Sequence, residues 1–178
     1  MLKRIITVLA LYLLCACSSV QVTDYAKFQP IIDPVIFFNG ELWAHGVIKN
    51  RGNRVIRTFS AKINAYWKDG IGTLEEDFVF NDGEEQRRVW TLTPNKSGGY
   101  TGTADDVIGD GLLTLSGNSV FLDYVLRVPY GDSTIDLRVD DRMYLVSPEV
   151  LINESRMTKF GVTVGFIDLV IIRQPPSN

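Results

Sequence analysis

The chain of 178 residues has few of the residues that build common catalytic and metal sites. It contains a single histidine, two cysteines and no G-x-x-x-x-G-K-[ST] segment. One histidine cannot supply a multi-histidine zinc site, and the missing segment excludes that type of nucleotide-phosphate loop. No internal apolar run reaches the ~18 residues of a membrane-spanning helix, which excludes a polytopic helical membrane protein. We expect neither a metal nor an organic cofactor.

Positive charge is also scarce. The chain has 18 basic and 21 acidic residues, a formal net charge of −3, and no run of Lys or Arg after its first residues. Nucleic acids and anionic membrane surfaces are bound through clustered positive charge. The sequence therefore predicts no nucleic-acid partner, and any membrane attachment has to come from a lipid.

The N-terminus has the pattern of an export signal. Lys3-Arg4 is followed by an apolar run over residues 5–14, which is too short for a permanent membrane span but typical of a signal peptide. We expect residues 1–16 to be a signal peptide that is removed.

A second motif overlaps the end of this signal. Leu14-Cys15-Ala16-Cys17 resembles a bacterial lipobox, in which the final cysteine receives fatty acyl chains such as palmitate. The resemblance predicts lipid attachment at Cys17. Because Ser18 is not the Asp that retains such proteins in the inner membrane, it also implies the periplasmic face of the outer membrane. The alternative is an ordinary secretory signal with incidental cysteines.

The remaining chain divides into three segments. Residues 17–38 are expected to form a lipid-anchored tether, in which Pro30 and Pro34 break any helix. Residues 39–174 are expected to form a β-barrel domain, and residues 175–178 a C-terminal tail.

Apolar residues alternate with polar ones through most of residues 39–174. One example is the set Val120, Leu122, Tyr124, Leu126 and Val128. A period of two indicates a half-buried strand, and Gly- and Asn-containing turn signals recur between such segments. Residues 147–159 are ambiguous and would also accommodate a short helical turn.

These patterns predict an all-β fold, a single antiparallel meander of about 8–10 strands. Without helices to cover it, such a sheet buries its apolar face as a sandwich or by closing on itself. Sequential tight hairpins favour closure into a lipocalin-like barrel. A membrane-spanning barrel is the rival, but outward charges such as Lys62 and Arg138 do not suit a lipid-facing wall.

Five charged residues fall on otherwise apolar, inward faces. Burying an unpaired charge costs several kcal/mol or more, so we expect these groups to pair with one another. Two cations and three acids leave one carboxylate without a partner. We expect that carboxylate either to have a raised pKa or to face a cavity. The five residues are Arg57, Glu76, Arg88, Asp106 and Asp141.

This set has three interpretations. As a ligand site, Arg57 and Arg88 contact a head group and the three acids complete the polar network. As a structural feature, the charges form ion pairs or reach water at strand ends. As an enzyme, Glu76 and Asp141 act as paired carboxylates of a hydrolase.

Several longer motifs resemble a family of Gram-negative bacterial lipoproteins known as a domain of unknown function. The resemblance covers nearly all of the chain after the signal and implies a single lipoprotein domain without naming an activity. A weaker likeness, through Gly40-Glu41-Leu42-Trp43, is to lipocalin-type barrels. The motifs include Phe37-Phe38-Asn39-Gly40, Leu74-Glu75-Glu76-Asp77-Phe78, residues 100–109, and Asp140-Asp141-Arg142-Met143-Tyr144.

Together these observations predict a non-enzymatic barrel, anchored by its acyl chains, that binds a small amphiphilic or lipid-like ligand. The alternative is a solid-cored envelope scaffold that docks a protein partner. The two differ in the interior, because a ligand binder needs a cavity of about 300 Å³ or more.

Overall fold

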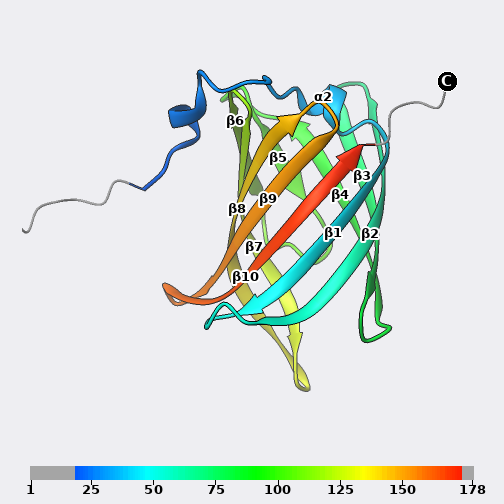
Figure 1. Ribbon diagram of the computed structural model, residues 1–178, viewed down its shortest axis with the longest axis vertical. Helices are drawn as coiled ribbons and strands as arrows, with labels where there is room; N and C mark the ends of the chain where they lie inside the picture. The colour runs from blue at the N-terminus through cyan, green and yellow to red at the C-terminus, as the bar shows by residue number, and fades with distance from the viewer. Residues whose placement is uncertain (1–18, 174–178) are drawn as a thin grey trace, which may run out of the picture.

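The structure is a barrel of ten antiparallel strands with a short segment across one end (Figure 1). It is a computed structural model and describes residues 19–173, so the predicted signal peptide, Cys17 and the tail at 175–178 lie outside it. Within the described range, no helix is long and apolar enough to cross a membrane. The strands are β1 (Gly40–Asn50), β2 (Val55–Lys68), β3 (Ile71–Phe80), β4 (Glu85–Pro94), β5 (Tyr100–Thr103), β6 (Gly111–Ser116), β7 (Ser119–Tyr130), β8 (Ser133–Ser147), β9 (Val150–Lys159) and β10 (Val162–Arg173).

The meander closes on itself. Each strand pairs with the next along the chain, and β1 pairs with β10 from Leu42↔Arg173 to Asn50↔Gly165. This closure leaves the sheet without a free edge and excludes a sandwich. The predicted all-β meander closing into a barrel is confirmed, with ten strands.

Strand alternation places the core inside. In β8, Leu137, Val139, Met143 and Leu145 are buried, and Asp141 shares their face. The ambiguous segment 147–159 forms no helical turn, because β9 pairs along its length with both β8 and β10. Because β9 is hydrogen-bonded to a strand on each side, the segment is a strand, which the residue pattern alone did not decide.

Residues 19–39, called the cap segment here, run across one end of the barrel. They contain a 3₁₀ turn, η1 (Val22–Tyr25), and a one-turn helix, α2 (Pro34–Phe37). The prediction that Pro34 breaks any helix is wrong. Pro34 is the first helical residue, where its fixed φ suits a helix and its missing N–H is not needed, and Asp33 accepts a hydrogen bond from Val35 N at 2.9 Å.

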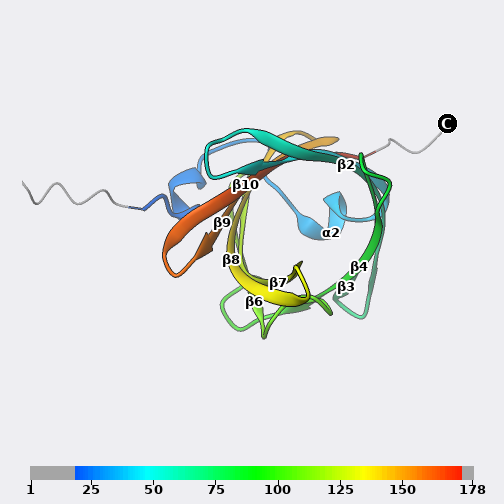
Figure 2. The ribbon, with the colours of Figure 1, turned by 90° about the horizontal axis from the view of Figure 1, so that it is seen from below.

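The cap segment seals this end, called the capped end. Viewed from the opposite end, α2 lies across the far end of the barrel (Figure 2). Phe37 and Phe38 are buried, and their rings meet edge to face at 5.0 Å. Trp67 Nε1 donates a hydrogen bond of 2.8 Å to the Phe38 carbonyl, and Ile32 N donates one of 2.9 Å to the Gly117 carbonyl.

Gly117 provides a test of how the cap segment is seated. Its φ is +56°, and an added Cβ would overlap the Tyr25 carbonyl oxygen, whereas Gly131 has a similar φ of +58° in open space. We expect Gly131→Ala to cost about 1 kcal/mol through backbone strain alone. Gly117→Ala should cost about 3 kcal/mol because strain and overlap add. Urea unfolding checks this, and equal costs would contradict the seating of η1 on the β6–β7 turn.

Candidate functional site

The barrel has a chamber that opens to solvent at the end opposite the cap, called the open end. The chamber has a volume of about 940 Å³ and lies among the hairpins of that end. Its wall is mostly apolar, with the Phe59 ring 5.7 Å from both Phe78 and Phe80. The other apolar wall residues are Ile48, Val89, Leu126, Val128, Pro129, Leu137, Met157 and Ile167. The polar and charged wall residues are Arg57, Glu84, Gln86, Arg87, Arg88, Asp105, Asp106, Arg127 and Thr134.

A smaller cavity of about 130 Å³ lies deeper, between the chamber and the cap. Phe59, Phe78, Arg88 and Ile167 line both spaces, so the two adjoin. Polar side chains interrupt the apolar lining of this inner cavity and are called the polar belt. They are Glu76, Arg88, Tyr124, Asp141, Asn153 and Ser155.

Arg88 is the cation of the polar belt. Its Nε and Nη2 donate hydrogen bonds of 2.7–3.0 Å to the Asp106 carboxylate, which lies in the β5–β6 connection. Burial alone would lower the Arg88 pKa, but the hydrogen bonds to Asp106 and the nearby acids outweigh it and raise that pKa. Arg88 therefore stays charged, and the bonds to Asp106 leave its Nη1 free of that carboxylate.

Glu76 faces Arg88 across the β3–β4 pair. Its side chain lines the inner cavity and is largely buried. Burial raises the Glu76 pKa to about 7, with Asp141 and Asp106 adding to the shift and Arg88 opposing it. Glu76 is thus a carboxyl group close to half-protonated at neutral pH.

Asp141 is the second buried acid, with 6% of its surface exposed. Burial raises its pKa to about 6, against the opposing effects of Ser155, Tyr124, Arg88 and Arg142. Its Oδ1 is buried and has no hydrogen-bond partner. Burial and the adjacent acid also raise the Tyr124 pKa, so Tyr124 keeps its proton and can donate.

Sequence reasoning missed Asn153 and Ser155. Both are buried on β9, and Asn153 Nδ2 donates a hydrogen bond of 3.4 Å to Ser155 Oγ, while Asn153 Oδ1 has no partner. The available signal was the alternation Leu151, Asn153, Ser155, Met157, which places two polar groups on an apolar face. That alternation was hidden because the segment also admitted a helical turn.

Arg57 does not join the polar belt, which corrects the expected pairing of all five charges. It lies at the rim of the chamber, where it contacts Asp82 and Glu84 of the β3–β4 turn at 2.6–2.7 Å. Its guanidinium also stacks on Phe80, 3.6 Å from the ring centre. The reason is position, since Arg57 is near the start of β2 and so faces the turn.

The charge count inside therefore differs from the expected one. With Arg57 at the rim and Arg88 held by Asp106, both Glu76 and Asp141 lack an ion pair among residues 19–173. The sequence predicted one surplus acid, and the structure has two. Their protonation relieves most of the cost of burial, which is why both pKa values rise.

The site is thus a chamber with a largely apolar wall, and the polar belt lies at its inner end and forms its floor. The floor holds one fixed cation and two acids that take up protons near neutral pH. Such groups can both donate and accept hydrogen bonds toward a bound polar group. His45, by contrast, is exposed on β1 and contacts Ser60 Oγ at 3.0 Å, away from this floor.

Two solved structures resemble this chain in fold at low sequence identity. One is EF1p2_mFAP2b bound to DFHBI, at 9% identity and a TM-score of 0.45, covering 78% of this chain and 94% of that chain. The other is the S-type phycobiliprotein lyase CPES from Guillardia theta, at 10% identity and a TM-score of 0.47, covering 78% and 89%. These values carry no argument about function.

The family comparison is more informative. No protein with a curated function matches this chain. A family described as "Protein of unknown function (DUF3833)" matches residues 11–173, which include every strand of the barrel. The chain therefore belongs to the DUF3833 family.

Proposed function

We propose that this protein is a non-enzymatic carrier or receptor that binds a small amphiphilic, lipid-like molecule in the open-end chamber. The observation that carries the proposal is the chamber itself. Its volume of about 940 Å³ lies within the ~300–1,000 Å³ usual for ligand pockets. A solid-cored scaffold would not leave this space inside its barrel.

The lining indicates the class of ligand. Eleven of the twenty residues that line the chamber are apolar and nine are polar or charged, so the lining suits a ligand with an apolar body, whose burial contributes to binding, and a polar part. Below the chamber, the polar belt of the adjoining inner cavity has Arg88 as a donor and two unpartnered buried acceptors, Asp141 Oδ1 and Asn153 Oδ1. A buried acceptor without a donor costs about 1–3 kcal/mol, which a ligand hydroxyl or acid group near the floor would partly recover.

The proposal includes lipid anchoring. Cys17 is taken as the acylated residue, and the periplasmic face of the outer membrane as the location, both from the motif at residues 14–18. An anchored barrel stays in the envelope while its chamber exchanges ligand with the aqueous space. Arg57 then contributes to the shape of the chamber mouth rather than to head-group binding.

A filled chamber tests the binding proposal. Ile167 points into the chamber, whereas Val164 on the same strand is on the outer face. Ile167→Trp should occupy part of the empty volume and weaken binding of dansyl-labelled undecanoic acid at least tenfold, while Val164→Trp should bind as the parent does. Fluorescence titration measures both, with circular dichroism confirming that each variant folds.

Two outcomes would contradict the proposal. The first is that the parent protein shows no saturable rise in dansyl emission. The second is that Ile167→Trp and Val164→Trp bind equally, which would place the probe on the outer surface.

A further inference from the structure

The cap segment has apolar side chains on both of its sides, and on the outer side they alternate with exposed Lys27, Gln29 and Asp33. Its inner side is buried against the barrel through Ile32, Phe37 and Phe38. Its other side presents large apolar side chains to the solvent, and these are called the outer cap surface. They are Phe28 (54% exposed), Ile31 (66%), Val35 (41%) and Ile36 (61%).

This arrangement is not needed to close the barrel. A surface helix ordinarily presents polar residues on the side that faces water, but Val35 and Ile36 are the outward residues of α2. Clustered exposed apolar residues usually mark a surface that contacts another apolar phase. The outer cap surface is therefore expected to be covered when the protein is in its working location.

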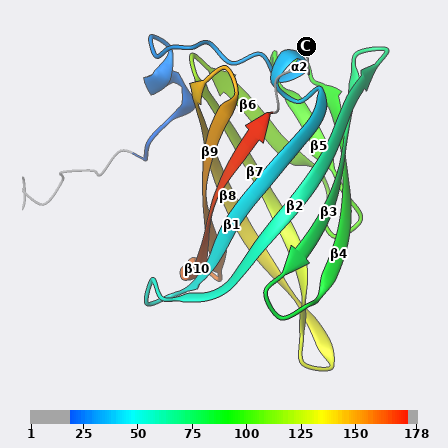
Figure 3. The same ribbon diagram turned by 45° about the vertical axis from the view of Figure 1, so that its right-hand side comes forward.

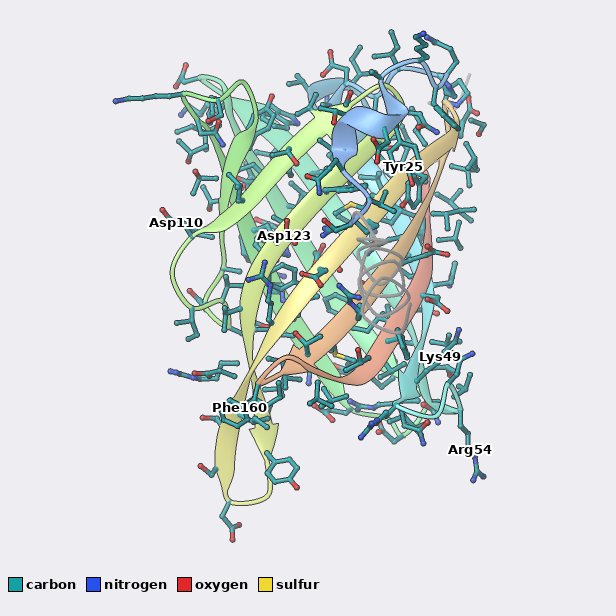
Figure 4. The ribbon with its side chains drawn as sticks, turned by 90° about the vertical axis from the view of Figure 1, so that its left-hand side faces the viewer. Tyr25, Lys49, Arg54, Asp110, Asp123 and Phe160 are labelled. Atoms are coloured by element: carbon teal, nitrogen blue, oxygen red, sulfur yellow. The ribbon has the colours of Figure 1, made fainter. Side chains whose placement is uncertain are left out.

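The path of the chain indicates what covers it. The cap segment begins at Ser19, two residues after Cys17, which limits the separation of their Cα atoms to about 7 Å. From there the segment runs beside the barrel and then across the capped end (Figures 1 and 3). Tyr25 lies toward this end, whereas Phe160 and Arg54 lie at the other (Figure 4).

η1 fixes this start of the chain against the barrel. The Tyr25 ring packs 5.2 Å from Tyr144 and 5.8 Å from Phe121, so the beginning of the cap segment is held rather than free. A lipid attached at Cys17 would consequently bring the capped end close to the bilayer. The open end would be the more distant one.

We propose that the outer cap surface rests in the headgroup layer of the bilayer that holds the acyl chains of Cys17, a proposal that rests on the lipid anchoring proposed above. Apolar area buried in the interface adds to the hold of the acyl chains. The chamber then opens away from that bilayer. Its ligand arrives from the aqueous side rather than directly from the anchoring membrane.

Site-specific quenching tests this orientation. The two cysteines of the chain are Cys15 and Cys17, so after processing and acylation Ile36→Cys or Phe160→Cys carries the single free thiol. Each full-length acylated variant is labelled with the fluorophore NBD. It is then placed on vesicles of phosphatidylethanolamine and phosphatidylglycerol that carry a nitroxide at headgroup depth.

Phe160 is the matched control because it is 93% exposed at the β9–β10 turn of the open end. The label at position 36 should lose most of its emission, and the label at position 160 should lose none. Unchanged emission at position 36, or equal loss at both positions, would overturn the proposal.

Flotation of the same samples separates the two proposals. If the chain fails to float with vesicles and Cys17→Ser behaves identically, the anchoring itself is wrong and the orientation falls with it. If the chain floats but the label at position 36 is not quenched, anchoring stands and membrane contact by the cap is wrong. In that case, if the unlabelled Ile36→Cys thiol reacts poorly with a maleimide in the native envelope, a protein partner covers the outer cap surface instead.

Discussion

Glu76→Gln should stabilise the barrel above neutral pH and leave its stability in acid unchanged. Burial raises the Glu76 pKa from 4.5 to about 7, so the folded state holds this proton more tightly than the unfolded state does. The free energy of unfolding should therefore fall as pH rises from about 4.5 to 7 and then level off. The glutamine variant stays neutral, so its stability should not fall over this pH range. Its free energy of unfolding should exceed that of the parent by up to about 3 kcal/mol at about pH 8.

Urea unfolding across this pH range measures the effect. Glu75→Gln is the matched control, because Glu75 is the outward neighbour on β3 and pairs with Arg87 at the surface. The free energy of unfolding of Glu75→Gln should change with pH as that of the parent does, except for the small contribution of the exposed Glu75–Arg87 pair. A Glu76→Gln variant that is less stable than the parent at about pH 8, or that keeps the full slope, would contradict the assignment of Glu76 as a buried surplus acid.

Arg88→Met should be the most destabilising of the charge substitutions. It removes the positive charge between Asp106 and Glu76. Losing one partner of a fully buried ion pair costs about 3–5 kcal/mol, and because the Asp106 side chain is 38% exposed the cost here should be about 2–3 kcal/mol. The cost should be largest above neutral pH and smaller at about pH 5, where Glu76 and Asp141 take up protons. Arg88→Lys keeps the charge without the two-point hydrogen bond, so it provides a folded variant if Arg88→Met does not fold.

Arg57→Met is the comparison for this prediction. The acids that hold Arg57 are about half exposed, so its loss should cost about 1 kcal/mol or less and show little pH dependence. Equal costs for the Arg57 and Arg88 variants would show that the polar belt is no more buried than the rim. Denaturation at two pH values distinguishes the outcomes.

Much of the barrel was predictable from the sequence because period-two alternation and Gly-containing turns are local signals. The inward faces of β3, β4 and β8 could be read directly, which located Glu76, Arg88 and Asp141 inside. Strand pairing then follows from short hairpins between neighbours.

The remaining features depend on three-dimensional position. Arg57 shares an inward face with Phe59, but where the barrel ends, and hence that Arg57 meets Asp82 and Glu84, is not a local property. The helix at Pro34 depends on the Asp33 cap and on burial of Phe37 against the barrel. The size of the chamber depends on how side chains from ten strands fill a common interior.

The most direct test of a ligand-binding barrel is native mass spectrometry of the full-length protein extracted gently from the envelope. The account predicts a stoichiometric small amphiphile that is released on denaturation and absent from Ile167→Trp. Lipid extraction would identify its chemistry. A bare protein mass, persisting after incubation with an envelope lipid extract, would contradict the account.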